Sequence, residues 1–133
     1  MIEDMPTSLI TQLTPRLVVA EAAKAIDFYC TALGADEQER FEVDGAIAHA
    51  RVTIDGLDVA LKDADEFDLA PPSLGGTPVI ISLTVTDADA VGQRMVDAGA
   101  TVVFEVGDRD YGFRDGRLRD PFGHLWIVSQ PLR

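Results

Sequence analysis

The pattern of apolar and polar residues divides the first part of the chain into short strands around one amphipathic helix. Branched apolar residues predominate between residues 13 and 19, which is typical of a strand. The next segment, residues 21–33, repeats apolar side chains at a helical spacing. This apolar stripe consists of Ala22, Ala25, Ile26, Tyr29 and Leu33. Gly34 follows it, at the position where a left-handed residue commonly ends a helix.

Three further strands are predicted at residues 36–43, 46–54 and 57–62. The dipeptides Asp44-Gly45 and Asp55-Gly56 separate these strands. Asp-Gly pairs between alternating segments are typical of tight hairpin turns. The first part of the chain is therefore predicted to have the order β-α-β-β-β.

The second part of the chain repeats this pattern. Its predicted elements are a strand at 79–85, a helix at 87–98 and strands at 101–106, 112–119 and 124–129. Similar landmarks recur in the same order at offsets of 65 to 67 residues, among them Gly34-Ala35 and Gly99-Ala100. We therefore expect one domain built from two copies of a module, at about 12–62 and 78–130, joined by an acidic, Pro/Gly-rich linker at about 63–77.

Charge and composition restrict the classes of function. The formal net charge of −12 excludes a nucleic-acid binder that acts through bulk phosphate attraction, and it disfavours an anionic membrane as a partner. A cationic ligand stays open. The single cysteine, Cys30, excludes an internal disulfide and a cysteine zinc cluster. The start Met1–Asp4 is acidic, unlike a secretion signal, and no apolar run could span a membrane, so we expect a cytoplasmic protein.

Several short motifs together resemble the vicinal oxygen chelate superfamily, which includes glyoxalase I, the bleomycin-resistance proteins and the extradiol dioxygenases. The first half contributes Leu17-Val18-Val19, Ala25-Ile26-Asp27-Phe28-Tyr29 and Leu33-Gly34-Ala35. The second half contributes Val85 to Ala90, Ala98-Gly99-Ala100 and Asp120-Pro121-Phe122-Gly123-His124. The segment from Tyr111 to Trp126 resembles the PhnB-like branch. The match covers nearly the whole chain after residue 12.

The resemblance implies an α+β fold of two tandem β-α-β-β-β modules. Their eight strands are expected to form one curved open sheet, a cup, with the helices outside. In the family a divalent metal sits in the cup and is bound by the first and last strand of each module. The resemblance also implies a homodimer whose cups are shared between subunits.

At the metal positions the sequence departs from the metal-dependent members of the family. The resemblance places these four positions at Thr14, Ala60, Ile80 and Ile127. Alanine and isoleucine have no donor atom, and a threonine hydroxyl is a poor ligand for a divalent ion. We therefore expect no family metal site and no cofactor. An atypical site with His49 or His124 stays open, because two histidines and a carboxylate can hold a metal.

Strand alternation selects the residues that would line the cup. It places Ala48, Ala50 and Val52 under the helix, and Ile47 with His49 and Arg51 on the opposite face. The complete set of expected ligand-binding residues is Arg16, His49, Arg51, Ala60, Ile80, Ser82, Tyr111, Arg114 and Ile127. Such a lining is mostly apolar with a few polar groups, as is usual for small-ligand sites.

The polar candidates each have a second interpretation. Arg16 and Arg51 suit a carboxylate or phosphate ligand, or they form ion pairs with acidic residues on the next strand. His49 is either a pocket residue or an inert strand histidine. Tyr111 and Arg114 belong either to a binding loop or to a solvated hairpin. His124 is interpreted as a structural residue that bonds to the backbone of the turn before it.

Two functions remain from the sequence. The first is a metal-free protein that binds a small apolar or cationic molecule, as the bleomycin-resistance proteins sequester a drug, which would serve antibiotic resistance. The second is an enzyme of the family, a glyoxalase-type lyase, isomerase or dioxygenase, with an unrecognised metal site or with metal-free acid–base catalysis. The donor-free positions Ala60, Ile80 and Ile127 favour the first.

Overall fold

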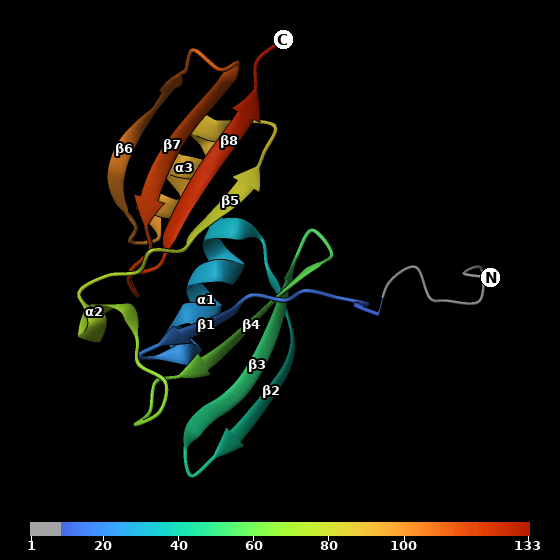
Figure 1. The fold of residues 1–133 in the computed structure, drawn as a ribbon, viewed down its shortest axis with the longest axis vertical. Helices are drawn as coiled ribbons and strands as arrows, with labels where there is room; N and C mark the ends of the chain where they lie inside the picture. The colour runs from blue at the N-terminus through green and yellow to red at the C-terminus, as the bar shows by residue number, and fades with distance from the viewer. Residues whose placement is uncertain (1–8) are drawn as a thin grey trace, which may run out of the picture.

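A computed structural model describes residues 9–133, so the acidic start Met1–Asp4 lies outside the described residues. The first half contains β1 (Arg16–Val19), α1 (Ala22–Leu33), β2 (Asp36–Val43), β3 (Ala46–Ile54) and β4 (Leu57–Asp63). A linker with the short helix α2 (Pro71–Leu74) follows. The second half contains β5 (Ile80–Thr84), α3 (Ala88–Asp97), β6 (Thr101–Asp108), β7 (Phe113–Arg119) and β8 (Leu125–Pro131) (Figure 1).

Each half of the chain forms its own four-stranded sheet. The strand orders are β1-β4-β3-β2 and β5-β8-β7-β6. The first strand of each half runs parallel to the last one, and the other neighbours are antiparallel. The predicted α+β fold of paired β-α-β-β-β modules is therefore confirmed. The expected continuous eight-stranded sheet is corrected, because β1 and β5 are edge strands and no ladder joins them within residues 9–133.

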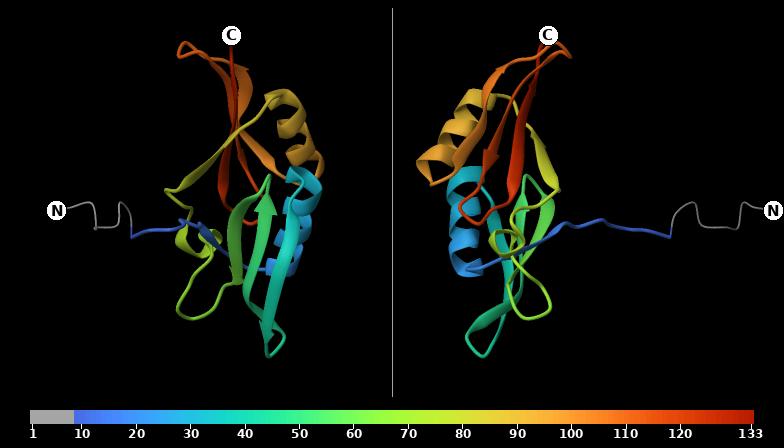
Figure 2. Two further views of the ribbon diagram at one scale, coloured as in Figure 1. Left: turned by 90° about the vertical axis from the view of Figure 1, so that its right-hand side faces the viewer. Right: turned by 60° about the vertical axis from the view of Figure 1, so that its left-hand side comes forward.

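Both long helices cover the same side of the two sheets, and the opposite sheet faces stay open (Figure 2). The predicted stripe of α1 is buried at Ala22, Ala25, Ile26 and Tyr29. These side chains belong to one apolar core that also includes Met95 of α3 and Trp126 and Val128 of β8. Since α1 and α3 also contact each other, a single core supports both sheets.

Two local predictions about strands are wrong. The first strand begins at Arg16 and not at residue 13, and Leu13 is exposed. In β3, Phe41 pairs with His49 while Glu42 pairs with Ile47, so Ala48 is an extra residue in a β-bulge. The bulge turns Ile47 into the core, where it is 4% exposed, and removes it from the open face.

A buried polar cluster joins the two halves. The carboxylate of Asp120 accepts hydrogen bonds from the hydroxyl of Tyr29 in α1 and from Nε1 of Trp126 in β8. His124 donates from Nε2 to the carbonyl oxygen of Val18 in β1 at 2.9 Å. His124 is thus structural, as predicted, but its ring bonds to the backbone of the other half and not to its own turn. Burial and the nearby Asp120 hold the pKa of the Tyr29 hydroxyl well above its usual range.

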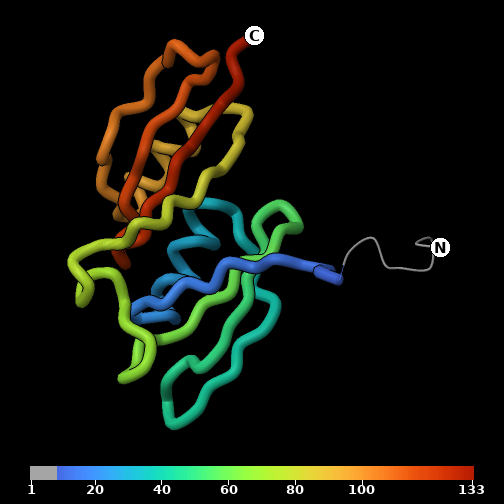
Figure 3. Tube along the Cα trace, in the orientation of Figure 1, coloured from blue at the N-terminus to red at the C-terminus, as the bar shows by residue number. Residues whose placement is uncertain are grey.

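The linker runs along one side of the molecule from the lower to the upper sheet (Figure 3). The buried Lys62 forms ion pairs with Asp65 and Asp68 where the linker begins. The helical turn at Pro71–Leu74 was not predicted from the Pro/Gly-rich sequence. Proline is well suited to the first turn of a helix, where its missing N–H costs no hydrogen bond. None of the helices formed by residues 9–133 has the length and apolar character needed to cross a membrane.

Candidate functional site

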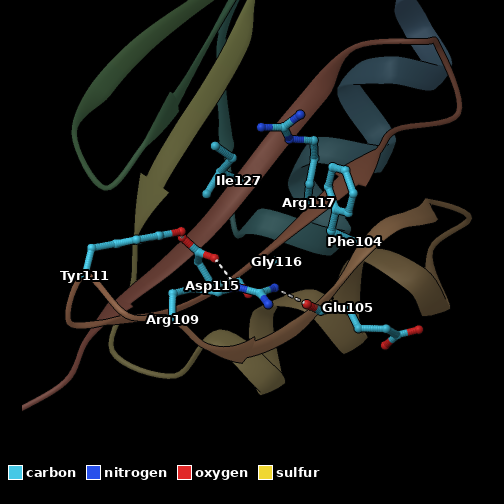
Figure 4. Close-up of a pocket in the computed structure, with 8 residues that line it drawn as sticks. All are labelled: Phe104, Glu105, Arg109, Tyr111, Asp115, Gly116, Arg117 and Ile127. Carbon is cyan, nitrogen blue, oxygen red and sulfur yellow. Dashed lines mark hydrogen bonds and ion pairs between the residues drawn. The ribbon is translucent and has the colours of Figure 1, made fainter.

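The open face of the second sheet contains a pocket of about 290 Å³. Strand β7 alternates between the two faces: Gly116 and Leu118 are buried toward α3, so Asp115 and Arg117 lie on the open face. Ile127 of β8 pairs with Arg117 and forms part of the same surface. The residues that line the pocket are Phe104, Glu105, Arg109, Tyr111, Asp115, Gly116, Arg117 and Ile127 (Figure 4).

Asp115 lies at the centre of a hydrogen-bond network in this pocket. Its Oδ1 accepts a bond from Nε of Arg109 at 2.9 Å, and its Oδ2 accepts one from the Tyr111 hydroxyl at 2.6 Å. Arg109 also donates to the carbonyl oxygens of Glu105 and Asp115. These contacts hold the β6–β7 turn against β7, so this end of the pocket is formed before any ligand arrives.

The network fixes the protonation states of its members. Burial alone would raise the pKa of Asp115, but the bonds from Tyr111 and Arg109 outweigh it and lower that pKa. The hydrogen bond to Asp115, together with partial burial, raises the pKa of Tyr111. Asp115 is therefore a carboxylate near neutral pH and Tyr111 a neutral phenol, which suits binding better than general-base catalysis.

Arg117 occupies the other end of the pocket. Its guanidinium carbon lies 5.3 Å from the centroid of the Phe104 ring, a cation–π arrangement. Its Nε is buried and has no hydrogen-bond partner within the described part of the chain. Figure 4 shows the guanidinium above the Phe104 ring and beside Ile127, whereas the Glu105 carboxylate points away from the other side chains.

The open face of the first sheet carries a different polar group. His49 donates to Glu39 at 2.8 Å, and Arg51 forms ion pairs with Glu39 at 3.3 Å and Asp58 at 3.1 Å. The hydrogen bonds from His49 and then Arg51 lower the pKa of Glu39. Of the two interpretations of Arg51, the structure thus shows the ion pair with acidic residues on neighbouring strands.

The remaining predicted site residues are spread over the molecule. Arg16 donates to the carbonyl oxygen of Ala48 at 3.1 Å and lines a separate hollow of about 360 Å³, between β1, the linker and β5. Ser82 pairs with Ile127 in the parallel ladder, and both Ser82 and Ile80 are exposed on β5. Of the nine predicted ligand-binding residues, the pocket of the second sheet brings together Tyr111 and Ile127.

Arg114 lies away from this pocket. Its guanidinium forms a two-bond pair with Asp89 in the first turn of α3, at 2.8 and 2.9 Å, and a further bond to Asp108. It therefore attaches β7 to the helix that covers the opposite side of the sheet. The sequence predicted a strand at 112–119 but assigned Arg114, with Tyr111, to a binding loop or a solvated hairpin. In the structure Arg114 lies within β7, and alternation turns it toward the helix.

The residues at the family's metal positions do not suit a divalent ion. Ala60 is buried and pairs with Arg16, whose positive charge opposes a cation. Thr14, the position with an oxygen, accepts a hydrogen bond from Gln12 at 3.0 Å. Over residues 9–133, no three His, Cys, Asp or Glu side chains cluster in a way that could hold a metal ion. The residues at these positions thus supply neither negative charge nor a set of donor atoms arranged to coordinate a divalent ion.

Sequence reasoning missed five polar or aromatic residues of the pocket: Phe104, Glu105, Arg109, Asp115 and Arg117. A usable signal was present for two of them, because alternation along 113–119 places Asp115 and Arg117 on one face. Phe104 lies between two irregularities in the β6–β7 pairing, so its face could not be counted from the sequence. The position of Arg109 in the pocket depends on the conformation of the β6–β7 turn, which the sequence pattern does not specify.

Comparison with known proteins supports the assignment of the fold. A family model described as the Glyoxalase/Bleomycin resistance protein/Dioxygenase superfamily matches residues 10–128. An uncharacterised protein of Mycobacterium bovis is 49% identical over 127 residues, which cover 91% of this chain and 84% of the relative.

Two solved structures show the same arrangement of elements. TioX from a Micromonospora species is 26% identical with a TM-score of 0.74, and the match covers 92% of this chain and 100% of that one. A gene product from Arabidopsis thaliana is also 26% identical, with a TM-score of 0.75 and coverage of 91% and 99%.

Proposed function

The chain belongs to the Glyoxalase/Bleomycin resistance protein/Dioxygenase superfamily, and on that premise we propose that it binds a small molecule on the open face of its second sheet without help from a metal ion. The observation that carries the proposal is the pocket itself. It combines an apolar surface at Ile127 with a fixed polar network around Asp115. A few placed polar groups within an apolar hollow are the usual composition of a small-ligand site.

The chemistry of the side chains favours binding over metal-dependent catalysis. Ala60, Ile80 and Ile127 offer no electron pair at the positions where the family binds its metal. The His49–Glu39 pair lies on the other sheet, half exposed, and has Arg51 as a competing partner. The absence of a cofactor stays a prediction, as do a role in antibiotic resistance and a place in the cytoplasm.

A homodimer is part of the proposal. Both β1 and β5 are edge strands, and the apolar side chains of Leu13, Val79 and Ile80 beside them are exposed. Open edges and exposed apolar groups favour association, and twofold pairing is the commonest form. Light scattering should give twice the chain mass of 14.4 kDa, whereas a monomer at micromolar concentration would contradict this.

The proposed function is tested by metal analysis combined with ligand-induced stabilisation. Protein purified without chelators is analysed for zinc, nickel, manganese and iron, and is then screened with small molecules by thermal unfolding. We expect substoichiometric metal and at least one compound that raises the Tm. Stoichiometric metal bound by the chain, or loss of ligand binding after treatment with EDTA, would overturn the proposal.

A further inference from the structure

Arg117 differs from the arginines that are held in ion pairs in this acidic chain. Four others pair with carboxylates: Arg40, Arg51, Arg109 and Arg114. Within residues 9–133, Arg117 has no ion pair, and its buried Nε has no acceptor. The chain has 23 acidic side chains, yet none of the described ones pairs with this guanidinium. Its positive charge and its N–H donors are therefore free to bind a negatively charged group of a ligand.

The guanidinium of Arg117 is held in one orientation. Its carbon sits over the Phe104 ring, and the strand position opposite Ile127 fixes the base of the side chain. The N–H groups of a guanidinium lie in one plane and form a rigid fork. That geometry suits a planar acceptor with two oxygens, which binds a guanidinium with two parallel hydrogen bonds.

The carboxylate of Asp115 forms no ion pair with Arg117, although its negative charge acts on Arg117 at longer range. Both oxygens of Asp115 are already bonded, one to Arg109 and one to Tyr111. The Glu105 carboxylate points away from the pocket (Figure 4). Two arginines and one inward carboxylate therefore leave an excess of one positive charge, although the whole chain carries −12.

The local charge outweighs the net charge of the chain for a bound ligand. Interactions between exposed charges are largely screened beyond about 8 Å at physiological ionic strength, whereas a partly buried group in contact is screened far less. A cationic ligand in this pocket would meet Arg109 and Arg117 at contact distance. The net charge had suggested a cationic compound; the groups of the pocket itself favour an anion.

The rest of the lining is apolar or aromatic. Phe104, Tyr111 and Ile127 offer flat or branched carbon surfaces around the polar groups. With a volume of about 290 Å³ the pocket matches a molecule of one or two rings. We infer that the pocket takes a small aromatic carboxylate, whose carboxylate pairs with Arg117 and whose ring lies against Ile127. This inference rests on the proposed function and names the class of its ligand.

Three probes that share one ring system but differ in charge test whether the charge of the ligand determines its affinity. These are 2-naphthoate, the neutral 2-naphthamide and the cationic 2-naphthylmethylammonium, each titrated into the full-length protein by calorimetry. We expect 2-naphthoate to bind at least about tenfold more tightly than the amide, since a hydrogen-bonded charge contributes that much. The ammonium probe should bind most weakly. This series decides the inference on the unaltered chain, so it depends on no variant being folded.

Two variants locate the effect. Arg117→Gln keeps a polar side chain of similar length but removes the charge, and it should weaken 2-naphthoate about tenfold while leaving the amide nearly unchanged. Arg119→Gln is the matched control, because Arg119 is the next residue on the same face of β7 and does not line the pocket. It should bind 2-naphthoate as the unaltered protein does.

The outcomes distinguish this inference from the function on which it rests. Equal or tighter binding of the amide or ammonium probe would overturn the anionic ligand class and leave small-molecule binding intact. Equal loss in Arg117→Gln and Arg119→Gln would overturn the role of Arg117, because it would show a general charge effect. No saturable binding by any of the three probes would overturn both the inference and the proposed pocket.

Discussion

At the scale of single residues, Asp115 is the side chain on which the pocket's order depends. Its carboxylate is 15% exposed and accepts from both Arg109 and Tyr111. Without its negative charge, the guanidinium of Arg109 would stay half-buried among carbonyl oxygens without a counter-ion. Because a charge left without its partner is costly, the turn that carries Tyr111 should loosen as well.

We therefore predict that Asp115→Asn lowers the free energy of unfolding by about 2 kcal/mol, the usual cost of a lost charged hydrogen bond. Urea denaturation measures the change. Asp110→Asn, an exposed position in the same turn, is the matched control and should change little. If the two variants are equally stable, the network around Asp115 does not hold the pocket.

Asp65 gives a prediction for pH. Lys62, followed by the backbone N–H groups of Asp68 and Phe67, lowers the pKa of Asp65 to about 2. The pKa of an aspartate in the unfolded chain is about 3.9. Ionised Asp65 therefore stabilises the fold above that pH, and this contribution is lost as the pH falls toward 2. A carboxyl NMR titration should show this midpoint. Lys62→Met should raise the midpoint, and a midpoint that does not respond would show that Lys62 is not the cause.

At the scale of elements, side chains at equivalent positions of the two halves accept a hydrogen bond from the first turn of each long helix. Asp63, at the end of β4, accepts from the N–H of Ala22 in α1 and from the N–H of Ile47 in β3. In the second half Gln130 accepts from the N–H of Ala88 in α3. Since Glu21 makes no capping bond, Asp63 supplies what the helix sequence lacks.

This difference predicts an order of stability. Asp63→Ala removes a charged acceptor of two backbone groups and should cost about 2 kcal/mol. Gln130→Ala removes a neutral side chain that accepts from a single backbone N–H group, and α3 keeps its own N-terminal cap at Asp87. This substitution should therefore lower the free energy of unfolding by less. Thermal unfolding of both variants gives the comparison. A larger loss in Gln130→Ala would contradict the assigned roles.

Two glycines beside Val106 predict opposite effects of one substitution. A Cβ on Gly116 would lie 2.8 Å from Val106 Cγ2 and 3.0 Å from the carbonyl oxygen of Phe104, so Gly116→Ala must displace β6. We expect a loss of about 1–3 kcal/mol. A Cβ on Gly92 would meet Val106 at 3.5 Å, an ordinary contact, and Ala is a better helix former by up to about 1 kcal/mol. Gly92→Ala should therefore stabilise the protein. Chemical denaturation of the pair checks both signs, and a neutral Gly116→Ala would show that β6 is free to move.

The elements themselves were largely predictable, because their signals are local. Hairpin turns at Asp44-Gly45 and Asp55-Gly56 and the apolar stripe of α1 require only neighbouring residues, and the structure has them where expected. The bulge at Ala48 was not predictable, since it depends on how β2 and β3 pair across the sheet. That single extra residue moved Ile47 from the expected pocket face into the core.

At the scale of the whole molecule, the internal repeat predicted the two modules and the family resemblance predicted the fold, but most of the pocket residues were found only in the structure. Tyr111 and Ile127 were identified because one lies in a charge-dense turn and the other at a family position. Arg109 joins Asp115 in the pocket only because the turn folds back over the strand. Contacts of this kind depend on side-chain direction and on partners several residues away, which a linear pattern does not encode.

The central claim is that the open face of the second sheet is the place where this chain binds a small molecule. Amide NMR shifts of EDTA-treated protein, followed during titration with 2-naphthoate, test the claim most directly. We predict saturable shifts that concentrate at residues 104–117 and at Ile127, with His49 and Arg51 on the other sheet unaffected. Saturable shifts centred on the His49 face, or none at any residue, would contradict it.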